Sequence, residues 1–358
     1  MKFLREDAPE LQQLNWLVGK FAVLSGFTVD PQELLAQRVR HTGWQAGPSQ
    51  SVGGSCHLML TSDQQWVGIN LARAEDHELL AIFFPTISWR EKTRRENQIV
   101  ISQLREAVKE CIASELIEFA IDVGLPISRL GEVSNNYSQD QLPVSIQNVE
   151  NVATPRVDKP IEVIDLSSLW AGPLCSHLLH RCGYSVTKVE SQQRPDGARF
   201  GNPKFFAELD AGKNHVVIDF SSNDGINQLH EMIRNADVVI EGSRPRALQQ
   251  LGIDAEQILR EARPRVWLSI TGYGREGSVG QRVGFGDDCA VAGGLVDHLP
   301  AGPQFVGDAV ADPITGLVAA TAILRAVKEQ KSCLIAVSLA ETASWLNSVR
   351  GNRESQQD

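Results

Sequence analysis

The sequence predicts an α/β protein with a doubly wound, mostly parallel sheet, preceded by a smaller N-terminal α+β region. Three observations lead to this fold class. The 358 residues are enough for two ordinary domains. With 42% hydrophobic and 22% charged residues, the chain can bury a substantial core. After residue 160, short apolar runs alternate with segments of helical spacing, a pattern typical of parallel sheets.

The strands of the predicted sheet are short apolar runs of the kind that are buried on both faces. They lie at 161–167, 184–190, 215–220, 237–241 and 265–272. Helical spacing between them predicts helices at 173–183, 226–236 and 247–262. Ligands of such sheets bind beyond the carboxyl ends of the strands. The turns that start at Leu169, Ser191 and Gly242 should therefore surround one crevice.

The residues before the sheet predict a region of mixed helices and strands. The stretch 57–84 has the pattern of strand, turn, strand and helix, and 105–126 has that of helices closed by Gly124 and Pro126. A polar stretch with three prolines then predicts a linker. The expected division is a region at 1–132, a linker at 133–160, the sheet domain at 161–349 and a flexible tail at 350–358.

The charge and the cysteines indicate where the protein works and which partners it lacks. A net charge of −10 argues against a general nucleic-acid binder and against binding to an anionic membrane. No apolar run reaches about 18 residues, and the start MKFLREDAPELQQ has no apolar signal core. The six cysteines form no CxxC pair, as is typical of reduced thiols. We expect a cytoplasmic protein.

Basic residues fall in the loops that follow the predicted strands, on the side of the crevice. They are Arg199, Lys213, Arg244 and Arg246. In an acidic protein this placement suits a phosphate-rich ligand, because arginine binds phosphate through two parallel hydrogen bonds. Solvated loop charge is an equally weighted alternative.

Two other motifs carry weaker predictions. The turn LWAGPLC and Glu190, at the end of the second strand, resemble a dinucleotide site, but the turn lacks the GxGxxG glycines. His177 and His180 lie three residues apart on a helix, yet no acid or cysteine completes a metal site. We expect neither a nicotinamide cofactor nor a metal.

The stretch VADPITGLVAATAILRAV places Asp312 and a proline directly before a long apolar helix. Asp is a preferred N-cap, and proline is favoured at the first helical position. Asp312 is therefore expected to cap this helix, and a carboxylate there can also act as a nucleophile. The glycine-rich stretch 272–294 carries Asp287 and Asp288 and is either a binding loop or a set of turns.

Six segments, in this order, resemble the family III CoA-transferases, also called the CaiB/BaiF family. They are VIDLSSLWAGPLCSHLLHRCGYSVTKVES, the arginine of PDGARF, AGKNHVVIDF, ADVVIEGSRPRALQQLGID, PRVWLSITGYGREG and ADPITGLVAATAILRAV, from about 161 to 340. The resemblance implies a Rossmann-like large domain, a small domain and an interlocked dimer. It also implies acyl-CoA thioesters and free carboxylic acids as substrates, with no permanently bound cofactor.

The resemblance assigns roles to individual residues. The family's catalytic aspartate opens an apolar helix in a D-x-x-x-G segment, which here is DPITG and gives Asp312; the spacing disfavours Asp308. Coenzyme A should lie over the turn after the first strand, at Trp170 and Ala171. The other CoA-binding candidates are Arg199, Lys213, Ser243 and Arg244.

These residues predict CoA transfer between an acyl-CoA and a carboxylic acid through a covalent aspartyl intermediate. A catalytically inactive CoA-binding homologue or partner subunit is one alternative. An acyl-CoA isomerase or racemase is another, but Phe285 stands where racemases of the family carry a histidine base. The family's small domain normally follows the large one, whereas here a similar segment, ELIEFAIDVGLPISRLGEV, precedes it. The region 1–132 is therefore expected to be either a small-domain equivalent or a degenerate copy such as a subset of the family carries, which GGSCHLMLTSDQQWVGINLARAEDHELL resembles. We expect a homodimer.

Overall fold

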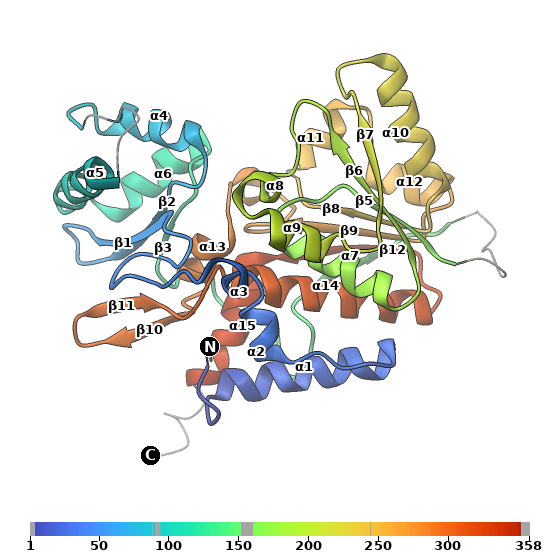
Figure 1. The fold of residues 1–358 in the computed structure, drawn as a ribbon, viewed down its shortest axis with the longest axis horizontal. Helices are drawn as coiled ribbons and strands as arrows, with labels where there is room; N and C mark the ends of the chain where they lie inside the picture. Colours follow the sequence, from blue (N-terminus) through green and yellow to red (C-terminus); the bar gives the residue numbers. More distant parts are fainter. Residues whose placement is uncertain (1–3, 88, 90–93, 152–159, 244, 352–358) are drawn as a thin grey trace.

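A computed structural model describes residues 4–87, 89, 94–151, 160–243 and 245–351. The molecule has two lobes, which Figure 1 shows side by side. The larger lobe holds the expected α/β sheet, and the smaller one holds a three-stranded sheet with its own helices. No helix in the described part of the chain is long and apolar enough to cross a membrane.

The large sheet has seven strands in the order β4-β12-β9-β8-β5-β6-β7. Their bounds are β4 (Ser145–Asn148), β5 (Glu162–Asp165), β6 (Ser185–Ser191), β7 (Asn214–Ile218), β8 (Val238–Glu241), β9 (Val266–Thr271) and β12 (Cys333–Ser338). All neighbours pair in parallel except β4, which runs antiparallel to β12 at one edge. The strand order reverses between β5 and β8, so this is the switch point at which such sheets bind ligands.

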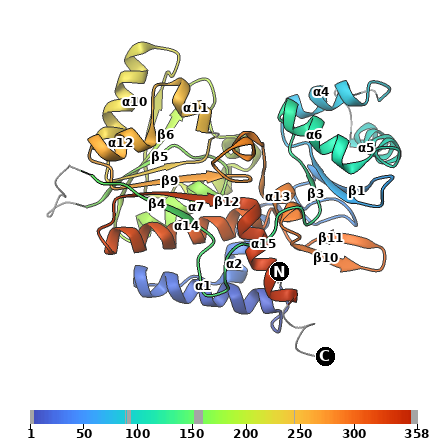
Figure 2. The same cartoon turned by 180° about the vertical axis from the view of Figure 1, so that it is seen from behind.

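Helices cover both faces of the sheet, as a doubly wound fold requires. One face packs against α7 (Ala171–Arg181), α9 (Pro203–Leu209), α14 (Ala311–Lys328) and α15 (Leu339–Gly351). The other packs against α10 (Asn223–Asn235), α11 (Pro245–Gln250) and α12 (Ala255–Glu261). Below α14, α1 (Pro9–Ser25) and α2 (Pro31–Leu35) add a third layer (Figure 2). The predicted fold class is confirmed.

The smaller lobe folds around the antiparallel sheet of β1 (Cys56–Leu60), β2 (Trp66–Asn70) and β3 (Ile127–Arg129). Its helices, α4 (Ala74–Phe83), α5 (Arg94–Val108) and α6 (Ala113–Val123), enclose a separate apolar core. Helix α13 (Gly286–Ala292) and the hairpin of β10 (Val296–Leu299) and β11 (Gly302–Phe305) join the lobes. Contact is close, since a Cβ added to Gly68 of β2 would lie 3.1 Å from Val291.

The structure differs from the expected elements in three places. The helix expected over 247–262 is two helices, and the chain turns between them at Gly252, whose φ of 72° favours glycine. The glycine-rich stretch 272–294 is not a plain set of turns, because it forms the short helices η1 (Ser278–Gln281) and α13. Part of the expected linker forms strand β4, while its residues 152–159 lie outside the described residues.

Two short helices and the chain end complete the description. Helix α3 (Val39–Thr42) follows α2, and α8 (Ala198–Gly201) follows β6. Of the expected tail, residues 352–358 lie outside the described part.

Candidate active site

Asp312 lies at the start of α14, beside the smaller lobe, but it does not cap the helix. Helix α14 begins at Ala311, so Asp312 is the second helical residue, and Val310 occupies the N-cap without a side-chain hydrogen bond. The expected cap is therefore wrong. The physical reason is the preceding turn: Ala309 adopts a φ of 44°, and its carbonyl accepts a 2.9 Å hydrogen bond from the Asp312 amide. This turn starts the helix before the aspartate.

Three more carboxylates surround Asp312 and form with it what we call the acid cluster. Its members are Asp287, Asp288, Asp308, Asp312 and the cation Arg38. Asp287, Asp288 and Asp308 are buried, whereas Asp312 as a whole residue is only partly buried. Gly286 leaves room for it, since an added Cβ there would lie 2.2 Å from its Oδ2. Asp312 is thus the least buried residue of this cluster.

Arg38 comes from the segment between α2 and α3 and contacts Asp308, which precedes α14. Its Nε donates a 2.7 Å hydrogen bond to Asp308 Oδ2, and its Nη2 donates to the other oxygen of the same carboxylate. The guanidinium also lies 5.2 Å from the ring centroid of Trp170. Arg38 therefore links the acid cluster to the turn at which the sequence places coenzyme A.

Hydrogen bonds hold the two acids of α13 in place. Asp287 accepts a 3.0 Å bond from the backbone of Ala309. Asp288 accepts a 2.8 Å bond from Asn70 Nδ2, on β2 of the smaller lobe, and a 3.0 Å bond from the amide of Phe285. The smaller lobe therefore helps to build the surroundings of Asp312.

Burial and mutual repulsion raise the pKa values of the acid cluster. For Asp312 burial is the main cause; Arg38 opposes it and the three neighbouring carboxylates add to it, which gives a pKa of about 7. The same balance raises the pKa of Asp287 to about 6. For Asp288, burial outweighs the hydrogen bond from Asn70 and raises the pKa to about 7. Near neutral pH the carboxyl groups of the cluster are therefore only partly ionised and share protons.

The turn after β5 leads into α7 and holds two of the expected CoA-binding residues. Leu169 adopts a φ of 71°, a left-handed conformation that is strained for leucine. Trp170 is buried against Phe205, and its Nε1 donates a 3.2 Å hydrogen bond to Gln37 Oε1. Ala171 is buried as the first residue of α7. What this turn offers a ligand is its backbone and the exposed Leu169 side chain.

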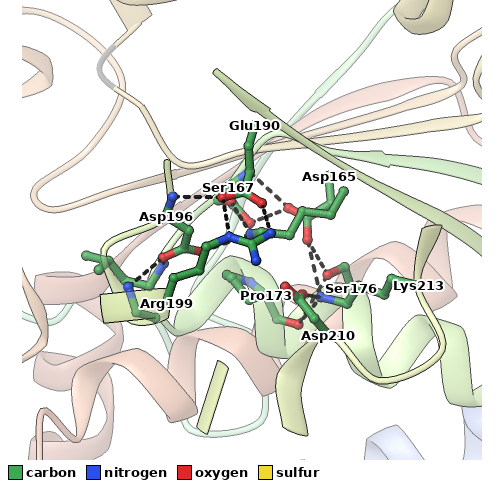
Figure 3. A network of polar contacts seen from close by, with 12 residues as sticks. Asp165, Ser167, Pro173, Ser176, Glu190, Asp196, Arg199, Asp210 and Lys213 are labelled. Carbon is green, nitrogen blue, oxygen red and sulfur yellow. Dashed lines mark hydrogen bonds and ion pairs between the residues drawn. The ribbon is translucent and has the colours of Figure 1, made fainter. Parts of the chain in front are cut away.

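Lys213 and Arg199 belong to a dense polar network around the same turn (Figure 3). The Lys213 side chain is fully buried, and its Nζ lies 2.9 Å from Asp210 Oδ1, 3.0 Å from the Pro173 carbonyl and 3.5 Å from Asp165 Oδ2. In this geometry its ammonium group holds α7 in place instead of facing the crevice. Arg199 pairs with Glu190.

Arg199 keeps a surface that a ligand can reach. Its guanidinium donates a 3.2 Å hydrogen bond from Nε to Glu190 and stacks 4.2 Å from the ring centroid of Phe206. About a third of the side chain remains exposed, at 36%. The neighbouring Phe200 is largely exposed.

The last two CoA-binding candidates follow β8. Ser243 Oγ donates a 3.1 Å hydrogen bond to Glu241 Oε2, so it holds the turn in shape while remaining half-buried. Arg244 lies outside the described residues. The structure thus brings Trp170, Ala171 and Arg199 to the carboxyl ends of β5 and β6, with Ser243 after the adjacent β8.

Sequence reasoning missed Arg38 and Asn70. Neither has a local signal, because each reaches its acid across more than 200 residues of chain. Asp287 and Asp288 were noted, but only as part of a glycine-rich stretch. Among the described residues, no group of three or more His, Cys, Asp or Glu side chains is placed to hold a metal ion.

Comparisons with known proteins match the sheet domain. A sequence model described as CoA-transferase family III covers residues 159–354, just over half of the chain. An acyl-CoA transferase of Fusarium pseudograminearum is 32% identical over 187 residues, covering 47% of this chain and 41% of that protein. A succinate–glutarate CoA-transferase of Agrobacterium fabrum is 31% identical over 186 residues, covering 47% and 46%.

Solved structures agree with the fold. The orthorhombic crystal structure of Rv3272 from Mycobacterium tuberculosis superimposes with a TM-score of 0.50 at 24% identity, over 59% of each chain. This likeness concerns the arrangement of the elements alone. The chain matches less than half of the length of the curated relatives named above.

Proposed function

Because the chain belongs to CoA-transferase family III, we propose that it is an enzyme that moves coenzyme A between an acyl-CoA thioester and a carboxylic acid, with Asp312 as the nucleophile. One observation carries this proposal: of the four acids of the cluster, Asp312 is the residue that is partly exposed, whereas the other three are buried. Attack on a thioester requires an ionised oxygen that the substrate can reach. Asp308, which Arg38 grips with two hydrogen bonds, lacks that freedom.

The reaction proceeds by two kinds of exchange at Asp312. Its carboxylate oxygen attacks the thioester carbonyl, the C–S bond breaks, and CoA thiolate leaves an aspartyl–acyl anhydride. The thiolate then attacks the aspartyl carbonyl, which releases the first acid and leaves an aspartyl-CoA thioester. The incoming carboxylate attacks the aspartyl carbonyl of that thioester, which expels CoA thiolate and leaves a second anhydride. The thiolate then attacks the acyl carbonyl of this anhydride, which forms the new acyl-CoA and releases the Asp312 carboxylate. Two easier steps thus replace one difficult step in each half of the reaction.

The acid cluster tunes the nucleophile. Its pKa of about 7 makes Asp312 a more basic carboxylate than a free one, while a large fraction is still ionised at neutral pH. Arg38 opposes the burial and the neighbouring acids, and so maintains that ionised fraction. The 2.7 Å bond to Asp308 fixes Arg38 in this position. We therefore assign Arg38 as a positioning residue for the reaction.

Coenzyme A is proposed to bind over the turn between β5 and α7. The backbone at Trp170 and Ala171 begins an 11-residue helix, whose free N–H groups favour phosphate. Arg199 supplies an exposed cationic edge nearby, and Ser243 and Arg244 follow the neighbouring strand. Lys213 contributes from below, since its bond to the Pro173 carbonyl supports the same turn.

Trapping the intermediate tests the reaction. Incubation with an acyl-CoA and hydroxylamine should convert the activated aspartyl group to a hydroxamate, which mass spectrometry locates at Asp312. A hydroxamate at another acid would refute the assignment of the nucleophile. Coenzyme A binding by calorimetry, without any adduct or turnover, would instead support an inactive binding homologue.

Assembly and location complete the proposal. We propose a cytoplasmic homodimer, as the family resemblance implies. Strand β4 supports association through its position, since it is an edge strand whose four residues are all exposed. Light scattering at micromolar concentration should give about twice the chain mass of 39.3 kDa. A mass of one chain would contradict the dimer.

A further inference from the structure

The side-chain amide of Asn70 has a buried oxygen that accepts no hydrogen bond from the described part of the chain. Asn70 is the last residue of β2 and is only 1% exposed. Its Nδ2 donates the 2.8 Å hydrogen bond to Asp288 Oδ1, but its own Oδ1 has no described donor. Buried amide oxygens are normally hydrogen-bonded, because leaving them unpaired costs free energy. Asp288, to which this amide is already bonded, is therefore the first candidate for the donor.

The hydrogen bonds around Asp288 are divided unevenly between its two oxygens. Oδ1 accepts the bond from Asn70 and the 3.0 Å bond from the amide of Phe285. Oδ2 has only longer contacts, at 3.3 Å from the Tyr273 hydroxyl and 3.9 Å from the Cys289 thiol. A neutral carboxyl group accepts mainly at its carbonyl oxygen and donates from its hydroxyl. The division therefore fits a carbonyl at Oδ1 and a hydroxyl at Oδ2.

Asp288 is also the acid of the cluster that Arg38 stabilises least. Arg38 donates two hydrogen bonds to Asp308. For Asp287 and Asp312, burial raises the pKa and Arg38 lowers it. The main influences on the pKa of Asp288 among the described residues are burial, hydrogen bonds and a neighbouring carboxylate, not a cation. Because the pKa values of Asp288 and Asp312 are both about 7, this difference favours a shared proton on Asp288.

The groups that can exchange a proton with Asp288 are its two acidic neighbours. Asp287 precedes it on α13, and Asp312 lies on α14. Three more titratable groups face it and are neutral near pH 7, because burial raises the pKa of each well above its usual value. They are Cys56 on β1, Tyr273 after β9 and Cys289. The proton of Asp288 is thus shared within the acid cluster.

The other neighbours of Asp288 leave its charge state to the cluster. Arg282 lies 3.7 Å from the ring centroid of Tyr273, but its Nη2 pairs with Glu132 at 2.7 Å. On β3, the Ser128 hydroxyl donates a 2.8 Å hydrogen bond to the backbone carbonyl of Asp288, not to its carboxyl group. Helix α15 packs against the C-terminal end of α13.

We propose that Asp288 is the protonated acid of the cluster at neutral pH, that its Oδ2–H donates to Asn70 Oδ1, and that the negative charge therefore lies on Asp312. A neutral carboxyl group and a side-chain amide can form two antiparallel hydrogen bonds, which pairs the amide oxygen and holds the proton in place. Asp288 and Asn70 are thus positioning residues, which act on the nucleophile through its charge. This consequence rests on the proposed CoA transfer, whereas the location of the proton does not.

A neutral Asp288 favours the ionised form of Asp312. Two carboxyl groups that share a buried site do not both ionise readily, since their charges repel each other. If one of them keeps the proton, the other can carry the charge. Because Asn70 belongs to the smaller lobe, that lobe selects through one amide which acid is ionised beside α14.

Infrared spectroscopy of the protein with isotope-labelled aspartate locates the proton without requiring turnover. A neutral carboxyl group absorbs at a higher frequency than a carboxylate, so the unmodified protein at pH 7 should show a neutral-carboxyl band that shifts with the label. Asp288→Asn should lose this band. Asp287→Asn, the matched change at the adjacent buried acid, should keep it. Identical bands in the unmodified protein and in Asp288→Asn would overturn the inference.

The pH profile of transfer gives a second readout, which is independent of the maximal rate. Because Asp288 is already neutral, Asp288→Asn should leave the pH at which kcat/KM rises nearly unchanged. Asp287→Asn removes an ionised neighbour of Asp312 and should lower that pH by about 0.5–1 unit. A structural role of Asp288 would change the height of the profile without producing this contrast. A larger downward shift in Asp288→Asn than in Asp287→Asn would contradict the proposal.

A further set of variants protects the test if Asp288→Asn does not fold. The neutral-carboxyl band should persist in both Asp287→Asn and Asp312→Asn. Asn70→Leu removes the hydrogen bonds to the neutral carboxyl group and should move the band to higher frequency. Loss of the band in Asp312→Asn would place the proton on the nucleophile and overturn the inference.

The infrared and transfer measurements separate this inference from the proposed function. A neutral Asp288 in a protein that transfers no coenzyme A would refute the function and leave the inference standing. Transfer by a protein in which Asp288 is ionised would refute the inference and leave the function standing.

Discussion

Two buried groups of charges differ in how many cations they contain: one surrounds the turn between β5 and α7, and the other lies at the starts of α13 and α14. The network of Figure 3 pairs four carboxylates with three cations, namely Asp165, Glu190, Asp196 and Asp210 with Lys188, Arg199 and Lys213. The acid cluster sets four carboxylates against Arg38 alone. We call the first the balanced network. Burial is similar in both, so the cation count separates their electrostatic behaviour.

The direction of the pKa shifts follows from that difference. Burial alone would raise the pKa of Asp165, but Lys213 and Lys188 outweigh it and lower the pKa. Glu190 behaves in the same way through Arg199. In the acid cluster burial prevails and raises the pKa values of Asp287, Asp288 and Asp312. The balanced network therefore keeps Asp165 and Glu190 ionised, whereas the acid excess moves the pKa values of its carboxyl groups towards neutrality.

The largest expected effect is that of Asp312→Asn on transfer. The amide cannot attack a thioester, so turnover should fall by roughly 10³-fold or more and the hydroxamate should disappear. Steady-state assays and adduct mass spectrometry measure both. The matched control is Asp224→Asn, which changes an exposed aspartate at the second position of α10, the same helical position. Ordinary turnover in Asp312→Asn would show that this acid is not the nucleophile.

The next effect is one of stability in the balanced network. Lys213→Met leaves Asp165 and Asp210 buried without their shared cation, which should lower the free energy of unfolding by about 3–5 kcal/mol. Urea unfolding at pH 7 measures the change. Lys204→Met, on the exposed side of the nearby α9, should change it by about 0.5 kcal/mol at most. A stable Lys213→Met that fails to bind coenzyme A would make Lys213 a direct ligand after all.

A smaller effect concerns the pH at which the enzyme works. The proposed reaction uses ionised Asp312 as the nucleophile, so kcat/KM should rise as the pH increases through about 7. Arg38 lowers the pKa of Asp312, so Arg38→Gln should move this rise to higher pH by about one unit. Arg38→Gln also removes the cation that pairs with buried Asp308, which can impair folding. A loss of activity that is uniform across pH would therefore indicate damage to folding instead of a shifted pKa of Asp312.

The sequence alone could predict the sheet and the nucleophile candidate, but not their electrostatics. The apolar runs predict the strands, because a strand that is buried on both faces needs apolar residues at nearly every position. Asp312 came from the DPITG segment. The prediction that Asp312 caps α14 was wrong because Ala309, a residue without a turn signature, adopts a positive φ. Its charge, its loop position and the family resemblance suggested Lys213 as a ligand, and only packing shows that its ammonium group is enclosed by acceptors.

The smallest expected effect distinguishes the two groups by the pH dependence of stability. A carboxyl whose pKa is raised in the native state keeps a proton that the unfolded chain has lost. Its contribution is fully present below about pH 4 and is lost as the pH rises through about 7. Asp165 and Glu190, with lowered pKa values, act in the opposite direction and destabilise the protein as the pH falls.

Asp312→Asn should therefore stabilise the protein at alkaline pH while it abolishes the reaction. Asparagine carries no charge to bury, so its advantage in the free energy of unfolding should be smallest near pH 4 and grow to on the order of 1 kcal/mol at pH 8. Urea unfolding at the two pH values measures it, with Asp224→Asn as the control. If Asp312→Asn is less stable than the unmodified protein at pH 8, Arg38 already compensates the negative charge of Asp312 fully. The acid cluster would then be balanced too, and the contrast with the network around Lys213 would fail.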